Sequence, residues 1–245
     1  MSEAPATSSP SAAGPGLSLP ARIWGVLTSP RETFADVAAR PRWLGMMLVA
    51  ILVSAVCTGG FLMTPVGQQA YLDNQIESTK RFVGEVSEAQ QAGMERMLPY
   101  AAPISAASIA VFTPIIWLVI SGILFAVFSA ALGGTATFKQ VFAVMAHSSA
   151  ITVVQQLFAT PLNYARESMS SATNLAVFLP MLDESSFVAK FLGTIDLFLV
   201  WWVVVLSIGL GVLFKRKTGP IAAGLFVIYG IIAVIVAAFF GRGGA

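Results

Sequence analysis

The feature that most constrains this chain is an uncharged apolar run of 18 residues, Leu197–Phe214. The hydrocarbon core of a bilayer is about 30 Å thick and needs roughly 20 apolar residues of helix to cross it. Because lipid offers no partner to backbone N–H and C=O groups, such a run must be helical. Three cations, Lys215–Lys217, follow it directly, and cationic flanks mark the cytoplasmic side of a span. The run therefore predicts an integral membrane protein and gives one span a direction.

The composition agrees with several membrane spans. Of the 245 residues 56% are hydrophobic and 11% are charged, about half the charged share of an average soluble domain. The mean hydropathy is +0.80, and the net charge of +2 is too small to indicate a nucleic-acid partner. Cys57 is the single cysteine and His147 the single histidine, which excludes an intrachain disulfide, a CxxC redox pair and a Cys/His metal site. We expect no metal and no cofactor.

The N-terminal part divides into a tail and a helical region. Residues 1–18 are rich in Pro, Ser, Ala and Gly, a composition typical of a disordered tail. Within 19–42, Ser29, Pro30 and Glu32 form a helix start, and the helix is predicted to end near Arg40, before a proline. Its apolar face predicts an amphipathic helix lying along the cytoplasmic membrane surface. The alternative is a short helix packed on the transmembrane domain.

Hydropathy then divides residues 43–240 into a transmembrane domain with two long polar connections. The predicted spans are about 43–63, 104–132, 138–159, 195–214 and 220–240. The connection 64–100 is expected to hold one or two amphipathic helices, and in 160–186 a helix is expected to start after Asp183 and run into the fourth span. The third span is the least apolar, so a re-entrant segment is its alternative. The predicted fold class is all-α, a polytopic membrane protein of five transmembrane helices with a cytosolic amphipathic N-terminal helix.

The charges predict the orientation. With the N-terminus inside, the inner segments carry eight Lys and Arg against three Asp and Glu, and the outer segments carry six against eight. Both short loops, 133–137 and 215–219, then lie inside, as the positive-inside rule favours. We expect a multi-pass protein of the bacterial cytoplasmic membrane, with its N-terminus in the cytoplasm and its C-terminus outside.

Several short motifs occur in an order that resembles the Yip domain family (Ypt/Rab-interacting proteins), in its prokaryotic form. The matching residues are Pro30–Phe34, Phe138–Val144, Ala146–Ser148, Asn174-Leu175, Phe191-Leu192, Ile195–Phe198, Trp202 and Gly209. The likeness covers about residues 24–240 and implies a five-helix bundle with a cytosolic N-terminus. Eukaryotic relatives are implicated in vesicle trafficking and bind Rab GTPases. This chain lacks their Asp-Leu-Tyr-Gly-Pro motif and has a short N-terminal region, so the resemblance does not carry GTPase binding over to it.

Polar residues inside spans are costly and are candidates for function. At 1.5 Å per residue, His147 lies about 13 Å from the inner edge and Asp196 about 27 Å from it. Gln155 and Gln156 lie at the depth of Asp196, and Tyr229 lies at the depth of His147. We therefore predict an outer cluster of Asp196 with the two glutamines, and a mid-membrane layer around His147 and Tyr229. The alternative is that these groups only lock the bundle together.

The function expected from these patterns is not enzymatic. The sequence has no GxSxG, HExxH or Walker motif. The leading hypothesis is a membrane scaffold or adaptor, or a trafficking-like organiser of membranes, and the alternative is a small channel or transporter that uses the polar layer. Expected partners are the lipid bilayer and other membrane proteins or further copies of this chain. The candidate N-terminal contact region consists of Ser29, Pro30, Arg31, Glu32 and Phe34.

Overall fold

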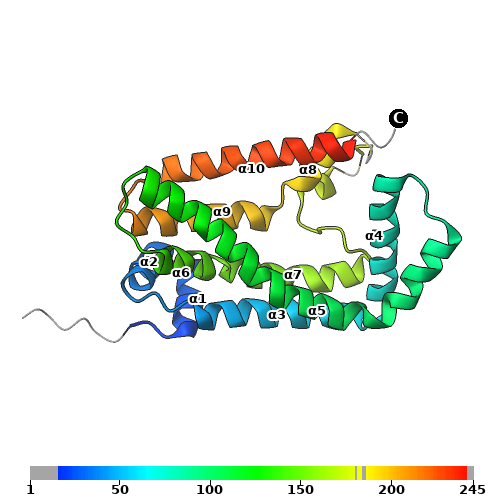
Figure 1. The fold of residues 1–245 in the computed structure, drawn as a ribbon, viewed down its shortest axis with the longest axis horizontal. Coiled ribbons are helices and arrows are strands. Elements are labelled where there is room, and N and C mark those ends of the chain that lie inside the picture. The colour runs from blue at the N-terminus through cyan, green and yellow to red at the C-terminus, as the bar shows by residue number, and fades with distance from the viewer. Residues whose placement is uncertain (1–15, 180, 184–185, 242–245) are drawn as a thin grey trace, which may run out of the picture.

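The computed structural model describes residues 16–179, 181–183 and 186–241, so most of the predicted tail 1–18 lies outside the described residues. Every regular element in these ranges is helical, and the only β-type pairing there is an isolated bridge between Asn174 and Asp196. The helices lie mainly side by side along one axis, with α4 set across one end (Figure 1). The all-α class is therefore confirmed.

Four described helical segments are long and apolar enough to cross a membrane. They are Leu44–Leu62, which is α3; Glu88–Ala131, which joins α5 (Glu88–Phe125) to the π-helix η1 (Ala126–Ala131); Phe138–Ala165, which joins α6 (Phe138–Ser148) to α7 (Ala150–Ala165); and Thr218–Ala238, which belongs to α10 (Thr218–Gly241). The predicted fourth span is α9 (Leu197–Leu213), an apolar helix of 17 residues and thus shorter than these four. Five spans are therefore not established, although an apolar helix occupies each predicted place.

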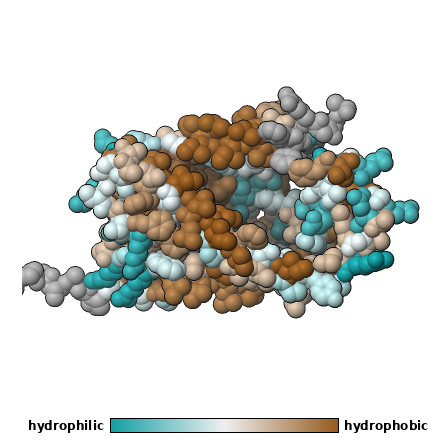
Figure 2. All heavy atoms as spheres, in the orientation of Figure 1, coloured by the Kyte–Doolittle hydropathy of each residue, from teal (hydrophilic) through white to brown (hydrophobic). Residues whose placement is uncertain are grey.

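Apolar side chains gather over α5 and α10 in the middle of the molecule, and hydrophilic ones lie toward both ends (Figure 2). This distribution is the one that a bilayer requires, because its hydrocarbon core excludes charged groups while both of its faces are wet.

The least apolar of these four segments is also the most enclosed of the four. In Phe138–Ala165 67% of the most apolar window is buried inside the bundle, against 17–22% in the other three segments. Every residue from Val141 to Ser148 is buried. This segment faces other helices more than lipid. It can therefore carry more polar residues than a helix that is surrounded by lipid. It is broken at Ser149, which separates α6 from α7.

The N-terminal region forms two short helices, α1 (Leu19–Thr28) and α2 (Pro30–Ala39). The predicted helix from Ser29 to Arg40 corresponds to α2, whose Phe34 and Val37 side chains have no exposed surface. They belong to the main core, where α2 packs against α6 and α9. These contacts match the alternative of a helix packed on the transmembrane domain, rather than a helix that rests only on the membrane surface.

The opposite end of the bundle holds α4 (Pro65–Val83), the start of α5, the 3-10 helix η2 (Leu175–Phe178) and α8 (Phe187–Thr194). The connection 64–100 thus contains two helices, but the second is continuous with the second span, so that helix begins at Glu88 and not near Ile104. A capping box formed by Ser87 and Gln90 starts it. Three prolines lie inside α5, and Figure 1 shows this helix bent, as prolines in a helix interior cause.

The helix predicted after Asp183 does not run into the fourth span. It ends at Thr194, and Ile195 and Asp196 adopt extended backbone angles before α9 begins. The two extended residues pair with the loop before η2, through Leu175 N–H to Ile195 O at 2.9 Å and Leu197 N–H to Thr173 O at 3.1 Å. This break places the Asp196 side chain at the start of a helix.

Candidate functional site

Asp196 is the N-cap of α9. Its Oδ1 accepts the backbone N–H of Phe198 at 2.8 Å and that of Leu199 at 3.2 Å. The first N–H groups of a helix have no partner within the helix, and the helix dipole favours a negative charge at this end. The carboxylate therefore satisfies donors that would otherwise be exposed to a low-dielectric environment.

The same carboxylate gathers three side chains from other segments. Its Oδ2 accepts the hydroxyls of Ser171 and Thr173, each at 2.6 Å, and its Oδ1 accepts Gln155 Nε2 of α7 at 3.2 Å. The predicted contact of Asp196 with Gln155 is present. Gln156 makes no hydrogen bond to Asp196 among the described residues, because it is the next residue on the helix and points in another direction.

Tyr229 of α10 completes this group of residues. Its hydroxyl accepts the backbone N–H of Asp196 at 3.2 Å and donates to the carbonyl of Thr194 at 2.5 Å. The prediction that Tyr229 meets His147 was wrong. Depth along a helix gives the level of a side chain but not its direction, and this face of α10 packs against the α8–α9 junction. We call Asp196, Gln155, Ser171, Thr173 and Tyr229 the Asp196 cluster.

Ser171 and Thr173 were not among the residues predicted from the sequence. Both lie in the polar connection 160–186, just before the motif Asn174-Leu175, and that connection returns to the bundle through the bridge of Asn174 with Asp196. A run of hydroxyl residues beside a recognised motif was the available signal. Pairing across the chain could not be read from it.

His147 is in a different environment. It lies on α6 with no exposed surface, its Nδ1 is 2.8 Å from the carbonyl of Ala143, and its Nε2 has no hydrogen-bond partner. The next residue, Ser148, donates to the carbonyl of Val144 on the same helix. His147 thus bonds to its own helix and not to Tyr229, so the predicted mid-membrane layer is not formed by these two residues.

The candidate contact region at the N-terminus is only partly accessible. Ser29, Arg31 and Glu32 are exposed and Pro30 is half-buried, whereas Phe34 is fully buried. Phe34 faces the bundle because α2 packs against α9 at Gly209, where a Cβ atom would approach the Phe34 ring to 3.1 Å and Val144 Cγ1 to 2.6 Å. Phe34 is therefore a packing residue, and the accessible part of the region consists of the others.

The Asp196 carboxylate is held by several hydrogen bonds. Five hydrogen bonds to its two oxygens occupy the carboxylate, and no group of three His, Cys, Asp or Glu residues in the described ranges is placed to hold a metal ion. The cluster joins α7, the loop before η2, the α8–α9 junction and α10. Its hydrogen bonds hold these four segments together at one place in the bundle.

Apolar helices of spanning length around such a cluster define a helical membrane protein. The model of the Yip1 domain matches residues 24–240, nearly the whole chain, and the chain belongs to the Yip1 family. Comparisons with curated proteins and with solved structures found no match. The resemblance inferred from short motifs is thus confirmed.

Proposed function

We propose that this chain is a non-enzymatic membrane scaffold or adaptor of the Yip type, in which the helical bundle is the anchor and the pair α1–α2 is the contact surface. The observation that carries the proposal is that two short helices with an exposed polar and aromatic face are held rigidly on one end of the bundle.

Helices of ten residues are not stable alone in water, so α1 and α2 depend on their packing. Arg22 has 2% of its surface exposed and forms an ion pair with Asp36, with Nη2 to Oδ2 at 2.7 Å and Nε to Oδ2 at 2.9 Å. Arg22 Nη2 also donates to the carbonyl of Arg40 at 3.1 Å. Two-donor contacts of this kind fix geometry as well as charge. The pair α1–α2 is therefore a preformed unit.

The outward side of this unit presents groups suited to protein contact. Trp24 on α1 has 68% of its surface exposed, and Arg31 and Glu32 on α2 are exposed as well. Tryptophan and arginine are enriched among the residues that dominate binding energy at interfaces. We define Trp24, Arg31 and Glu32 as the α1–α2 surface.

We also propose that this surface lies in the cytoplasm, with the chain in a bacterial cytoplasmic membrane. The support is that the inner segments predicted from charge lie together at one end. Gln140 Nε2 donates to the carbonyl of Ala38 at 2.9 Å, and Arg216 Nη2 donates to the carbonyl of Leu132 at 2.9 Å. These contacts bring the N-terminal helices and both short loops to one end, which concentrates eight cations there.

The arrangement of polar groups favours a scaffold over a channel or transporter. A polar path would need groups that follow one another through the membrane. The Asp196 carboxylate is engaged in hydrogen bonds at the α8–α9 junction. His147 on α6 is buried in the bundle and hydrogen-bonded to the carbonyl of Ala143, so these two residues do not form such a path.

The test is a cross-linking pulldown of the tagged full-length chain from its native membrane. Deletion of residues 1–42 is unsuitable, because it would remove Phe34 and Val37 from the core. The variant is instead Trp24→Ala/Arg31→Ala/Glu32→Ala, which changes exposed side chains only. The matched control is Met97→Ala/Arg96→Ala/Glu95→Ala, which removes one apolar, one cationic and one acidic exposed side chain at the opposite end.

We expect partner proteins that are captured with the wild type and the control to be lost with the α1–α2 variant, at equal amounts of chain in the membrane. The proposal fails if no partner is captured by the wild type, or if the α1–α2 variant keeps every partner.

A further inference from the structure

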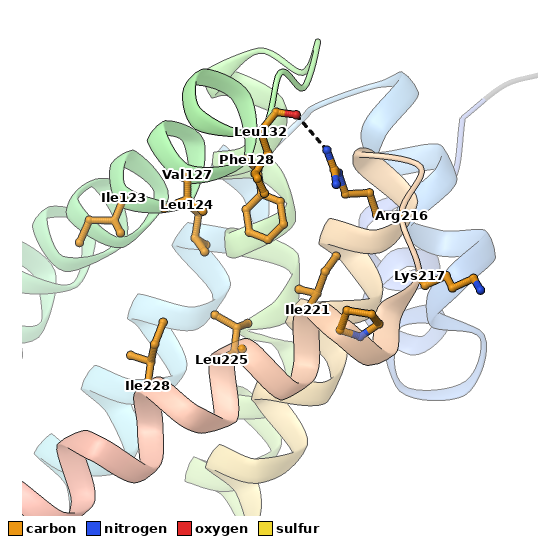
Figure 3. A pocket seen from close by; sticks show the side chains of 12 residues that line it. Ile123, Leu124, Val127, Phe128, Leu132, Arg216, Lys217, Ile221, Leu225 and Ile228 are labelled. Atoms are coloured by element: carbon orange, nitrogen blue, oxygen red, sulfur yellow. Dashed lines mark hydrogen bonds between the residues drawn. The ribbon is translucent and has the colours of Figure 1, made fainter.

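A groove of about 470 Å³ lies between the end of α5 with η1 and the first half of α10. Its walls are apolar, with Ile123 and Val127 on one side and Ile228 on the other, and Phe128 and Ile221 line it nearer to Arg216 (Figure 3). Ile123, Val127 and Ile228 expose 59%, 45% and 56% of their surfaces, so the groove opens to the outside of the bundle. In a membrane, the open side of the groove would face the lipid.

The π-helix shapes one wall of the groove. Leu132 N–H bonds to the carbonyl of Val127 and Gly134 N–H to that of Phe128, both at 3.0 Å. The wider turn, a form often found at functional sites, brings the Phe128 ring onto Phe214, with ring centroids 5.1 Å apart and an angle of 23°. Phe128, which lines the groove, is thereby held in place by an aromatic partner.

The mouth of the groove is cationic. Arg216 and Lys217 contribute to its lining, and the lining includes no acidic residue. Arg216 is exposed and donates from Nη2 to the carbonyl of Leu132, which is drawn across the mouth in Figure 3; the Lys217 side chain points away from the groove. The guanidinium has five N–H donors, and one of them serves Leu132. The others remain available to an anion at the mouth.

We propose that this groove binds an anionic phospholipid, with its phosphate on Arg216 and an acyl chain between α5 and α10. Arginine matches phosphate geometry with paired charge-assisted hydrogen bonds, and basic pockets at the end of membrane helices bind anionic headgroups. An acyl chain suits the walls because they are apolar and open to lipid. The Arg216 cation at the mouth favours a lipid over an apolar helix of a partner, because such a helix would leave Arg216 without a counter-charge.

The experiment measures lipid binding to the purified full-length chain in detergent by native mass spectrometry. Phosphatidylglycerol and phosphatidylcholine with identical acyl chains are added in separate titrations, because they differ in net charge and share their apolar part. Glycerol phosphate, which carries the anionic group without acyl chains, is added as a third probe.

Two variants test the two halves of the site. Arg216→Gln removes the cation at the mouth. Gly224→Leu fills the groove, because Gly224 is a lining residue and a Cβ atom there meets nothing within 4 Å. The matched controls are Lys139→Gln, an exposed cation at the start of α6, and Gly230→Leu, a position on α10 that has the same open space but does not line the groove.

We expect the wild type to bind phosphatidylglycerol roughly fivefold or more tightly than phosphatidylcholine, and to bind glycerol phosphate weakly. Arg216→Gln is expected to remove this preference and Gly224→Leu to reduce the binding of both lipids, while both controls retain wild-type values. The proposal is overturned if the two lipids bind equally to the wild type, if glycerol phosphate binds as tightly as phosphatidylglycerol, or if either variant behaves like its control.

Discussion

The Tyr229 hydroxyl and the Asp196 backbone form a hydrogen bond of 3.2 Å that links α10 to the start of α9. The same hydroxyl donates to the carbonyl of Thr194 at 2.5 Å. Tyr229 therefore satisfies one donor and one acceptor at the break between α8 and α9, where neither helix supplies a partner. Through this contact α10 is tied to the backbone of Asp196, the residue whose carboxylate already holds α7 and the loop before η2.

Tyr229→Phe tests this contact. The change removes the hydroxyl and keeps the ring, so the free energy of unfolding is expected to fall by about 1–2 kcal/mol. It is measured by denaturant titration in mixed micelles. Tyr164→Phe is the control, because Tyr164 is an exposed residue at the end of α7, and the contact is not stabilising if the two variants unfold alike.

Asp196→Ala is expected to be more harmful than Tyr229→Phe. It removes the cap of α9 and leaves the hydroxyls of Ser171 and Thr173 without their acceptor, a loss of at least about 2 kcal/mol. Asp196→Asn retains one oxygen for the cap, and its decrease in the free energy of unfolding is expected to lie between those of Tyr229→Phe and Asp196→Ala. A double-mutant cycle with Thr173→Val measures the coupling; additive effects of the two substitutions would contradict a shared hydrogen bond.

Gly209→Ala tests the close packing of α9 on α2 and α6. The added Cβ would approach Val144 Cγ1 to 2.6 Å, within the buried core, and overpacking of this kind costs about 1–3 kcal/mol. Gly230→Ala on α10 adds the same atom where nothing lies within 4 Å. The control is expected to be neutral or slightly stabilising, since alanine suits a helix better than glycine, and equal destabilisation of both variants would argue against the contact.

The proposed orientation is tested by labelling of single cysteines. In a Cys57→Ser background, Thr135→Cys lies in a loop at the end that carries α1 and α2, and Glu85→Cys lies in the loop between α4 and α5. We expect a membrane-impermeant maleimide to label Glu85→Cys in intact cells and Thr135→Cys only after permeabilisation. The reverse pattern would place the α1–α2 surface outside.

Helix type and position follow largely from the sequence, because hydropathy and caps are local properties. The start signal at Ser29 and Pro30 and the apolar runs correctly indicated the positions of α2, α3 and α10. The predicted cap itself is not formed, because Ser29 stands at the N-cap position of α2 but its side chain makes no capping hydrogen bond. The length of α9 could not be predicted from the sequence, since it depends on the pairing of Ile195 and Asp196 with residues twenty or more positions earlier in the chain. Such pairing leaves no periodic signal in the chain.

Contacts within the site could be predicted only where two residues meet because they lie at the same depth in the membrane. Counting residues from the inner edge placed Gln155 at the level of Asp196, and the two side chains meet. The same counting paired Tyr229 with His147, which was wrong because the direction of each side chain depends on helix rotation and tilt. Phe34 was assigned to a contact surface for a similar reason: an amphipathic face indicates burial but does not distinguish lipid from neighbouring helices.

The scaffold proposal is tested most directly by cross-linking from the α1–α2 surface in intact native membranes. A photoreactive phenylalanine derivative replaces Trp24 in one form of the full-length chain and Met97, an exposed residue at the opposite end, in another. We predict a discrete cross-linked product with a protein partner from position 24 and no such product from position 97. The absence of a protein product from position 24, or the same product from both positions, would contradict it.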